Sequence, residues 1–390
     1  SPRMPSPALT AQSVRSPWCV RRLGIASLPH TEASSLVFFG GSGPDPDSPS
    51  RGHRPGRTGT LCLRCPCPPL SQCYSGSGLV EVVRIIDLSC STTHPWQSLK
   101  ILHDFHGRPG GPPELRLTVV HEDIEFLDNM QALLSKHAST LVPSFHFDKV
   151  IGRLETLDFS NLREILKINY GEEVVISCAL KMHRLLTIDD NVSCDGIAQL
   201  QQMANMAQLK QMVSSMYSPA STLSYPQTPS PQRQIPNLLV SFLSAVRMLK
   251  PKIMVMMEQE ADHNAPLFRD RFAETLPYYA ALFDSLDAVA ATDQQRARVE
   301  RMLGEEIKNI LMCEGVQRHE RHERLNQWEM HMQRCQFGHV PLSFEAIREG
   351  KERLVSYKLK ECRSVEDNGR SLLCWGATPL YSISAWRPHR

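Results

Sequence analysis

The chain has 390 residues, of which 41% are hydrophobic and 22% are charged, a composition typical of a folded globular protein and unlike that of a disordered or fibrous one. Its 43 lysines and arginines nearly balance its 41 aspartates and glutamates, so the basic excess expected of a protein that binds duplex DNA with its own surface is missing. No apolar run reaches the roughly 18–20 residues of a membrane span, and the first residues lack the pattern of a secretory signal. We therefore expect the 12 cysteines to be reduced thiols in the cytosol or nucleus.

The first 78 residues differ from the rest of the chain. They are dominated by Pro, Gly, Ser, Arg and Cys and show no helical periodicity, so we expect a disordered segment or one wrongly assigned to this chain. Structural zinc sites pair two Cys-x2–4-Cys knuckles across a longer gap. The cysteines here crowd into one proline-flanked stretch, which argues against a zinc site: Cys62, Cys65, Cys67 and Cys73.

From residue 82 onward, short apolar runs alternate with helical patterns. The apolar runs predict five strands, at residues 82–88, 115–120, 145–150, 174–180 and 253–257. Apolar side chains recur at helical spacing in residues 96–105, 126–141, 239–249, 268–286 and 299–310. Strands that alternate with helices imply crossover connections, so we predict an α/β fold with a Rossmann-like, mostly parallel sheet flanked by helices.

Three further features modify this pattern. Residues 187–236 are rich in Gln, Met, Ser and Pro, which predicts a flexible insertion. Pro277 should kink the long helix in which it lies. Near the end of the chain, Ser371–Trp375 and Leu380–Trp386 predict two strands paired across a Gly/Pro turn.

A sheet of this kind binds ligands in the crevice at the carboxyl ends of its parallel strands. Asp87 ends the first predicted strand and is followed by LSCSTTH, which ends at His94 and lacks the glycines of a dinucleotide or S-adenosylmethionine site. Asp87 is able to hold a ribose hydroxyl, but a carboxylate that caps the next turn is the better interpretation. We therefore predict no cofactor at this position.

The densest polar cluster is EQEADHN, which runs from Glu258 to His263 and Asn264 directly after the fifth strand. Carboxylates beside a histidine are able to bind a metal or to perform acid–base chemistry. Alternatively, the segment is a hydrogen-bonded strand-to-helix turn with Asp262 or Asn264 as a cap. We favour the turn, because no second cluster offers an obvious partner.

Other candidate motifs are weaker. His319 and His322 lie in HERHE, which resembles the zinc-protease motif only superficially, because that motif needs histidines four residues apart on one helical face. We predict a solvated charged face there. Leu162–Leu166 resembles a leucine-rich docking helix, but core packing explains it equally well. With no Gly-x-Ser-x-Gly elbow and no P-loop in the sequence, we predict no catalytic residue and no metal ligand.

Several stretches resemble the motifs of the GRAS family, in the family's order. VRIID resembles the VHIID signature, with an arginine in place of the usual histidine: Val83, Arg84, Ile85, Ile86 and Asp87. Residues 145–185 resemble the region around the PFYRE motif, and residues 315–390 resemble the SAW region, with Trp375, Ser384, Ala385 and Trp386 as its motif residues. The most similar stretch is SFLSAVRMLKPKIMVMMEQEADHNAPLF, and the wording EQE-DHN and GEEIKNI is similar to the scarecrow-like subgroup.

The resemblance covers residues 79–390 and implies a Rossmann-like, methyltransferase-related core without the usual cofactor glycines. It further implies a nuclear plant regulator of transcription, active in development and in gibberellin or root signalling, without its own catalysis. Such proteins bind zinc-finger or other DNA-binding transcription factors and other GRAS proteins, so we expect no direct sequence-specific DNA binding, no membrane association and no cofactor.

One departure from the family leaves alternatives open. GRAS proteins carry a leucine-rich helical cap before the VHIID strand, which residues 1–78 do not resemble. We therefore expect a truncated GRAS domain whose exposed apolar surface makes it poorly soluble alone. Two further hypotheses are a non-functional fragment and a methyltransferase-like enzyme or small-molecule receptor. The latter would use polar groups of the sheet crevice: Asp87, His94, Glu258, His263 and Asn264.

Overall fold

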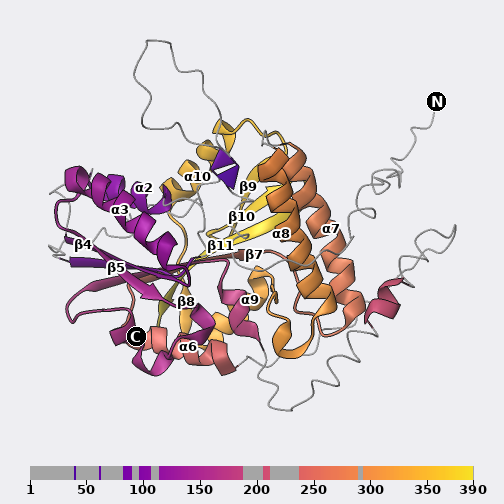
Figure 1. The fold of residues 1–390 in the computed structure, drawn as a ribbon, viewed down its shortest axis with the longest axis horizontal. Coiled ribbons are helices and arrows are strands. Elements are labelled where there is room, and N and C mark those ends of the chain that lie inside the picture. Colours follow the sequence, from indigo (N-terminus) through magenta and orange to yellow (C-terminus); the bar gives the residue numbers. More distant parts are fainter. Residues whose placement is uncertain are drawn as a thin grey trace, which may run out of the picture. The chain divides into compact units, whose positions relative to one another are not determined.

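The computed structural model describes residues 39–40, 61–62, 82–89, 96–106, 114–187, 205–210, 237–288 and 293–389 (Figure 1). Within the first 78 residues it describes two short strands that pair antiparallel, β1 (Phe39–Gly40) and β2 (Leu61–Cys62). Cys65, Cys67, Cys73 and His94 lie outside the described residues.

Nine strands form one mixed sheet in the order β5-β4-β3-β6-β7-β11-β10-β9, with β8 paired to β11. Five strands are parallel to their neighbours within this group: β3 (Val82–Asp87), β4 (Glu114–His121), β5 (Phe145–Ile151), β6 (Glu173–Ala179) and β7 (Ile253–Gln259). The rest of the sheet is antiparallel: β8 (Phe337–His339), β9 (Cys362–Asp367), β10 (Arg370–Trp375) and β11 (Thr378–Pro388).

The five predicted parallel strands are confirmed, each to within two residues at its ends. The predicted C-terminal strand pair is confirmed as β10 and β11, which are joined at Gly376, a residue in the left-handed region with φ 55°. Strands β8 and β9 were not predicted. Because β11 pairs antiparallel with β7, the C-terminal strands continue the parallel sheet rather than forming a separate domain.

Helices cover both faces of the sheet (Figure 1). Their bounds are α2 (Trp96–His106), α3 (Ile124–Leu141), α4 (Leu162–Ile165), α6 (Asn237–Leu249), α7 (Phe268–Asp287), α8 (Asp293–Met312), α9 (Leu325–Arg334) and α10 (Phe344–Ser356). Short 3-10 helices join several of them: η3 (Leu154–Thr156), η4 (Phe159–Asn161), η5 (Met182–Leu186) and η6 (Gly315–Gln317). None of these helices is long and apolar enough to cross a membrane.

Alternation of side chains along the strands produces two separate hydrophobic cores. In β7, Ile253, Val255 and Met257 pack on one face, whereas Met254 and Met256 pack on the other. The first core includes side chains of α2, α3, α7, α8 and α10, and the second includes side chains of α4, α6 and α9. A strand that is buried on both faces reads as a continuous apolar run, which is why IMVMM predicts a strand.

Local sequence signals set several helix ends. Asp123 begins α3 two residues earlier than predicted, because its carboxylate accepts hydrogen bonds from the backbone N–H groups of Glu125 (2.8 Å) and Phe126 (3.2 Å). Pro277 lies inside α7, which is continuous from Phe268 to Asp287. Within the predicted flexible insertion, the structure describes one helical stretch, residues 205–210, in which the side chain of Asn205 is buried.

Candidate functional site

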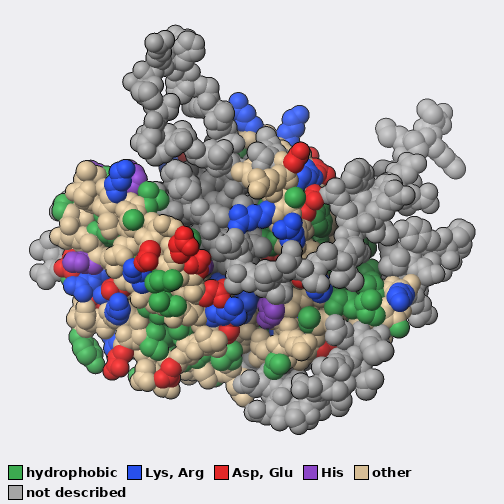
Figure 2. Space-filling view, in the orientation of Figure 1, with side chains coloured by type: hydrophobic (Ala, Val, Ile, Leu, Met, Phe, Trp, Pro, Cys, Tyr) green, Lys and Arg blue, Asp and Glu red, His purple; other side chains and the backbone are tan. Residues whose placement is uncertain are grey.

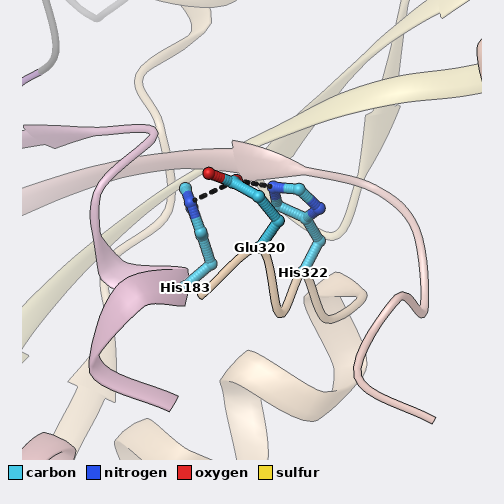
Figure 3. A group of neighbouring side chains, drawn as sticks. All are labelled: His183, Glu320 and His322. Carbon is cyan, nitrogen blue, oxygen red and sulfur yellow. Dashed lines mark ion pairs between the residues drawn. The ribbon is translucent and has the colours of Figure 1, made fainter. Parts of the chain in front are cut away.

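A cluster of buried polar side chains lies where the chain leaves the carboxyl ends of β6 and β7. β6 leads into η5, which carries His183, and Glu258 is the penultimate residue of β7. The third contributor is the irregular segment 318–324 between η6 and α9, which carries Glu320 and His322 (Figure 3). We call these residues, with His263 from the loop after β7, the buried His–Glu cluster.

Glu258 holds the start of η5. Its Oε1 atom accepts hydrogen bonds from the backbone N–H groups of Lys181 (3.0 Å) and Met182 (2.7 Å), and its Oε2 atom accepts one from Nδ1 of His183 (2.8 Å). One carboxylate thus satisfies two backbone donors and fixes the orientation of the imidazole ring. The side chains of both Glu258 and His183 are buried, so these bonds replace the water that each group loses.

His183 lies between two carboxylates. Its Nε2 atom is 3.1 Å from Oε2 of Glu320, on the side of the ring opposite to Glu258. Burial alone would lower the pKa of His183, but the negative charges of Glu258 and Glu320 outweigh that effect and raise the pKa to about 9. The ring is therefore an imidazolium at neutral pH when no other cation is bound to the cluster.

Glu320 connects His183 to two more bases. Its Oε1 atom accepts a hydrogen bond from Nη2 of Arg184 at 3.0 Å, and its Oε2 atom lies 3.3 Å from Nε2 of His322. Burial would raise the pKa of Glu320, yet the charge of Arg184 and the two histidines lower it well below its usual range. Glu320 is ionised inside the protein.

His322 and His263 form a neutral pair. Their Nδ1 atoms are 2.9 Å apart, so one donates a hydrogen bond to the other, and the backbone N–H of His263 donates to the carbonyl of His322 at 2.9 Å. Burial lowers the pKa of both rings, and their nearness to other cationic groups lowers it further. The loop after β7 and the segment 318–324 are thereby held together by both backbone and side chains.

The same two segments are joined a second time. Asn264 donates from Nδ2 to Oε1 of Glu323 at 2.7 Å and accepts at Oδ1 from Arg321 at 3.1 Å. Glu323 also accepts a hydrogen bond from Nε2 of His331 in α9, at 2.7 Å. These bonds continue the buried polar network from β7 to α9.

A small cavity adjoins the cluster. Its volume is about 10 Å³, enough for about one water molecule. His183, Glu320, Glu306 and Tyr381 are among the residues that line it. Burial, together with the charge of Glu320, raises the pKa of Glu306 to about 7, and Glu306 accepts a hydrogen bond from the hydroxyl of Tyr279 at 3.0 Å. The cavity is thus bordered by acidic groups and a histidine.

The structure corrects two sequence predictions. HERHE was predicted to be a solvated charged face, but Glu320, Arg321, His322 and Glu323 are buried, none more than 6% exposed. The prediction that EQEADHN has no partner cluster is wrong for the same reason, because HERHE is that partner. Hydrogen bonds join the two segments, and the buried carboxylates of Glu258, Glu320 and Glu323 each contact a histidine, which allows both segments to be buried.

The remaining crevice predictions have mixed outcomes. Glu258, His263 and Asn264 all belong to the polar network described above. Asp87 is buried, and its Oδ1 atom accepts a hydrogen bond from the backbone N–H of Ser89 at 2.9 Å, which fits the interpretation that it caps the next turn. Burial raises the pKa of Asp87.

Comparison with known proteins decides the family. The model of the GRAS domain family matches residues 71–387. The chain belongs to the GRAS domain family. It is 37% identical over 329 residues to Scarecrow-like protein 3 of Arabidopsis thaliana, covering 79% of this chain and 66% of that protein. It is 32% identical to the Arabidopsis DELLA protein RGL1, with 80% of this chain and 50% of the relative covered.

Its fold is similar to that of a solved GRAS protein. The crystal structure of SCL7 from Oryza sativa gives a TM-score of 0.61 at 26% identity and covers 79% of this chain and 74% of that one. The chain therefore spans between half and three quarters of the length of these GRAS relatives.

The VRIID residues of this GRAS chain form β3. Arg84, which stands where the family usually has histidine, is buried and donates hydrogen bonds to Oδ2 of Asp148 (2.9 Å), to Oγ1 of Thr118 (2.8 Å) and to Oε1 of Glu172 (3.2 Å). Arg84 therefore ties β3 to β4, to β5 and to the loop before β6. Val83, Ile85 and Ile86 pack into the two cores.

The SAW residues are also structural in this fold. Trp386 is fully buried on β11, and its Nε1 atom donates to Oγ of Ser384 at 2.9 Å. Trp375 on β10 donates from Nε1 to Oδ2 of Asp284 in α7 at 2.7 Å. Ala385 packs into the same core as Trp375, whereas Trp386 packs into the opposite one.

Proposed function

We propose that this GRAS chain is a plant transcriptional co-regulator of the scarecrow-like type. It acts in the nucleus, in development and gibberellin-related signalling, through protein partners and without catalysis. The observation that carries the proposal is the 37% identity to Scarecrow-like protein 3 over most of this chain, together with the similarity to a DELLA protein. Its partners are DNA-binding transcription factors, including zinc-finger proteins, and other GRAS proteins.

The use of the crevice supports action through partners. Side chains at the carboxyl ends of β6 and β7, where a substrate of such a sheet would bind, are bonded to other parts of the chain. Glu258 holds η5, and His183 faces Glu320 and Glu258. Substrates react where polar groups converge on an open pocket, whereas the described cavity beside this cluster is about 10 Å³.

The charge distribution supports contact with DNA through another protein. The formal net charge is +2, and acidic and basic side chains are interspersed on the face drawn in Figure 2. A protein that holds duplex DNA by itself neutralises several phosphates with clustered lysines and arginines. A partner that already carries the DNA-binding surface removes that requirement.

The test is a paired measurement on the full chain. Fused to an unrelated DNA-binding domain, the chain should change the output of a reporter gene in plant cells. Alone, it should bind duplex DNA no more tightly than a neutral protein does, with a dissociation constant, measured by fluorescence anisotropy, that is micromolar or weaker. Nanomolar, sequence-selective binding of the unfused chain, or a fusion without effect on any reporter, would contradict the proposal.

A further inference from the structure

Three side chains of the buried His–Glu cluster present metal-ligating atoms to one another. Nε2 of His183 lies 3.1 Å, and Nε2 of His322 lies 3.3 Å, from the same carboxylate oxygen, Oε2 of Glu320. The donor atoms of the three residues all lie within 4.8 Å of one another. Ligand atoms bonded at about 2.0–2.1 Å to one tetrahedral Zn²⁺ are about 3.3 Å apart. The two N–O distances therefore have the spacing of a metal's ligand set.

The contacts with Glu320 leave two of these atoms unsatisfied. Nε2 of His183 and Nε2 of His322 are buried and have no hydrogen-bond partner among the residues that the structure describes. Both nitrogens lie close to Oε2 of Glu320, at 3.1 and 3.3 Å, yet neither contact is a hydrogen bond. An ion that all three groups contact would satisfy these buried nitrogens, which converge on one carboxylate.

The groups behind the three ligands have the arrangement found around metal-bound histidines. Such a histidine usually bonds through its other ring nitrogen to a carboxylate or another acceptor, which fixes the ring. Glu258 takes this place at Nδ1 of His183, at 2.8 Å, and His263 lies 2.9 Å from Nδ1 of His322. Arg184 holds the second oxygen of Glu320 at 3.0 Å. All three ligands are thus oriented before any ion arrives.

The donor set selects the kind of ion. Two imidazole nitrogens and one carboxylate oxygen suit Zn²⁺ and neighbouring transition metals, whereas Mg²⁺ and Ca²⁺ prefer oxygen ligands alone. The cavity that His183 and Glu320 border has room for about one water molecule as a fourth ligand. Coordination would release the proton on Nε2 of His183 to solvent and leave the proton on Nδ1 bonded to Glu258.

We propose that His183, Glu320 and His322 bind one divalent transition-metal ion, with Zn²⁺ as the preferred ion (Figure 3). The ion joins η5, which follows β6, to the segment 318–324, which precedes α9. It therefore stabilises the junction between the parallel half of the sheet and the C-terminal region. The burial of all three ligands assigns the ion a structural role.

Co²⁺ provides the direct test, because its visible absorption reports both the geometry and the ligand types. The full chain, stripped with a chelator, should take up one Co²⁺ with the d–d absorption of a four- or five-coordinate N/O site, and Zn²⁺ should displace it. Thermal unfolding should shift upward with Zn²⁺, since an ion that binds only the folded state stabilises it. A sulfur-to-cobalt charge-transfer band would assign the ion to cysteines, such as those of residues 62–73, and would overturn the proposal.

Variants locate the ion. His322→Gln and Glu320→Gln should abolish the one-equivalent Co²⁺ signal, and Glu258→Gln should weaken Co²⁺ binding about 10–100-fold. His137→Gln, on the exposed side of α3, is the matched control and should leave uptake unchanged. If the ligand variants fail to fold, the wild-type chain still decides: the absence of stoichiometric Co²⁺ uptake by the folded protein would refute the site. Unchanged uptake by a folded ligand variant would refute it equally.

Discussion

Removing the carboxylate of Glu258 tests whether the buried His–Glu cluster holds the fold together. In Glu258→Ala, the backbone N–H groups of Lys181 and Met182 and the imidazolium of His183 lose their acceptor together. Removing one partner of a buried ion pair costs about 3–5 kcal/mol, because the other charge stays buried without compensation. We expect the free energy of unfolding of the variant to fall by about that amount.

A second substitution at the same position separates charge from hydrogen bonding. Glu258→Gln keeps a carbonyl oxygen that is able to accept from both backbone N–H groups, but it removes the negative charge beside His183. Its cost should be smaller, about 1–3 kcal/mol, the usual penalty when a buried polar group is poorly satisfied. The order of stability should therefore be wild type, then Gln, then Ala.

Urea unfolding of the full chain, followed by circular dichroism, measures these differences as shifts of the midpoint at constant slope. Glu366→Ala, on the exposed edge strand β9, is the matched control and should change stability by no more than about 0.5 kcal/mol. If Glu258→Ala costs no more than Glu366→Ala, the cluster is not what holds η5 in place, and the reasoning is wrong.

Three further predictions follow from individual contacts. Burial would raise the pKa of Glu172, but its hydrogen bonds with Arg84 outweigh burial and lower it, so this ion pair stabilises the fold above the normal carboxylate pKa and is lost as pH falls through the lowered value. Arg84→Met should therefore reduce the melting temperature most near pH 7, and the difference in melting temperature from wild type should narrow below about pH 4. A difference that stays constant with pH would contradict the pairing. Trp375→Phe removes the bond to Asp284 and should cost about 1 kcal/mol in urea unfolding; no measurable loss would mean that the exposed carboxylate contributes nothing. Calorimetric titration with S-adenosylmethionine should give no saturable heat, because Asp87 caps its own turn, and saturable binding that Asp87→Asn abolishes would instead favour an enzyme.

The regular part of the fold was readable from the sequence because buried strands and amphipathic helices have local patterns. IMVMM is a continuous apolar run of strand length, VVRIID is apolar except for Arg84 and Asp87, and both strands are buried on two faces of the sheet. Strand β9 was missed because its sequence, CRSVED, is charged and lies at the sheet edge, where one side chain in two is enough to pack. Strand β8 has three residues, too few to show an alternating pattern of apolar and polar side chains.

Only part of the buried polar network could be predicted from the sequence, because the other part depends on contacts between distant segments. EQEADHN stands out as a polar cluster beside a strand, but local pattern cannot show that HERHE, about sixty residues later, packs against it. Charged residues are rarely buried unless they are paired, so a charged segment without a partner in view is naturally assigned to solvent. The signal available was complementarity: each segment mixes acids with histidines, and neither has helical spacing.

The arrangement of the C-terminal region changes how the family motifs should be interpreted. β11 lies between β7 and β10, so its SAW residues occupy the interior of the sheet and not a separate surface. Trp386 reaches one core and Ala385 the other, while segment 318–324 is bonded to the loop after β7 through His322 and His263. Substitutions at these positions should therefore act first on folding, and a loss of partner binding that accompanies them locates no interface. An interface has to be sought among exposed side chains whose substitution leaves the unfolding midpoint unchanged.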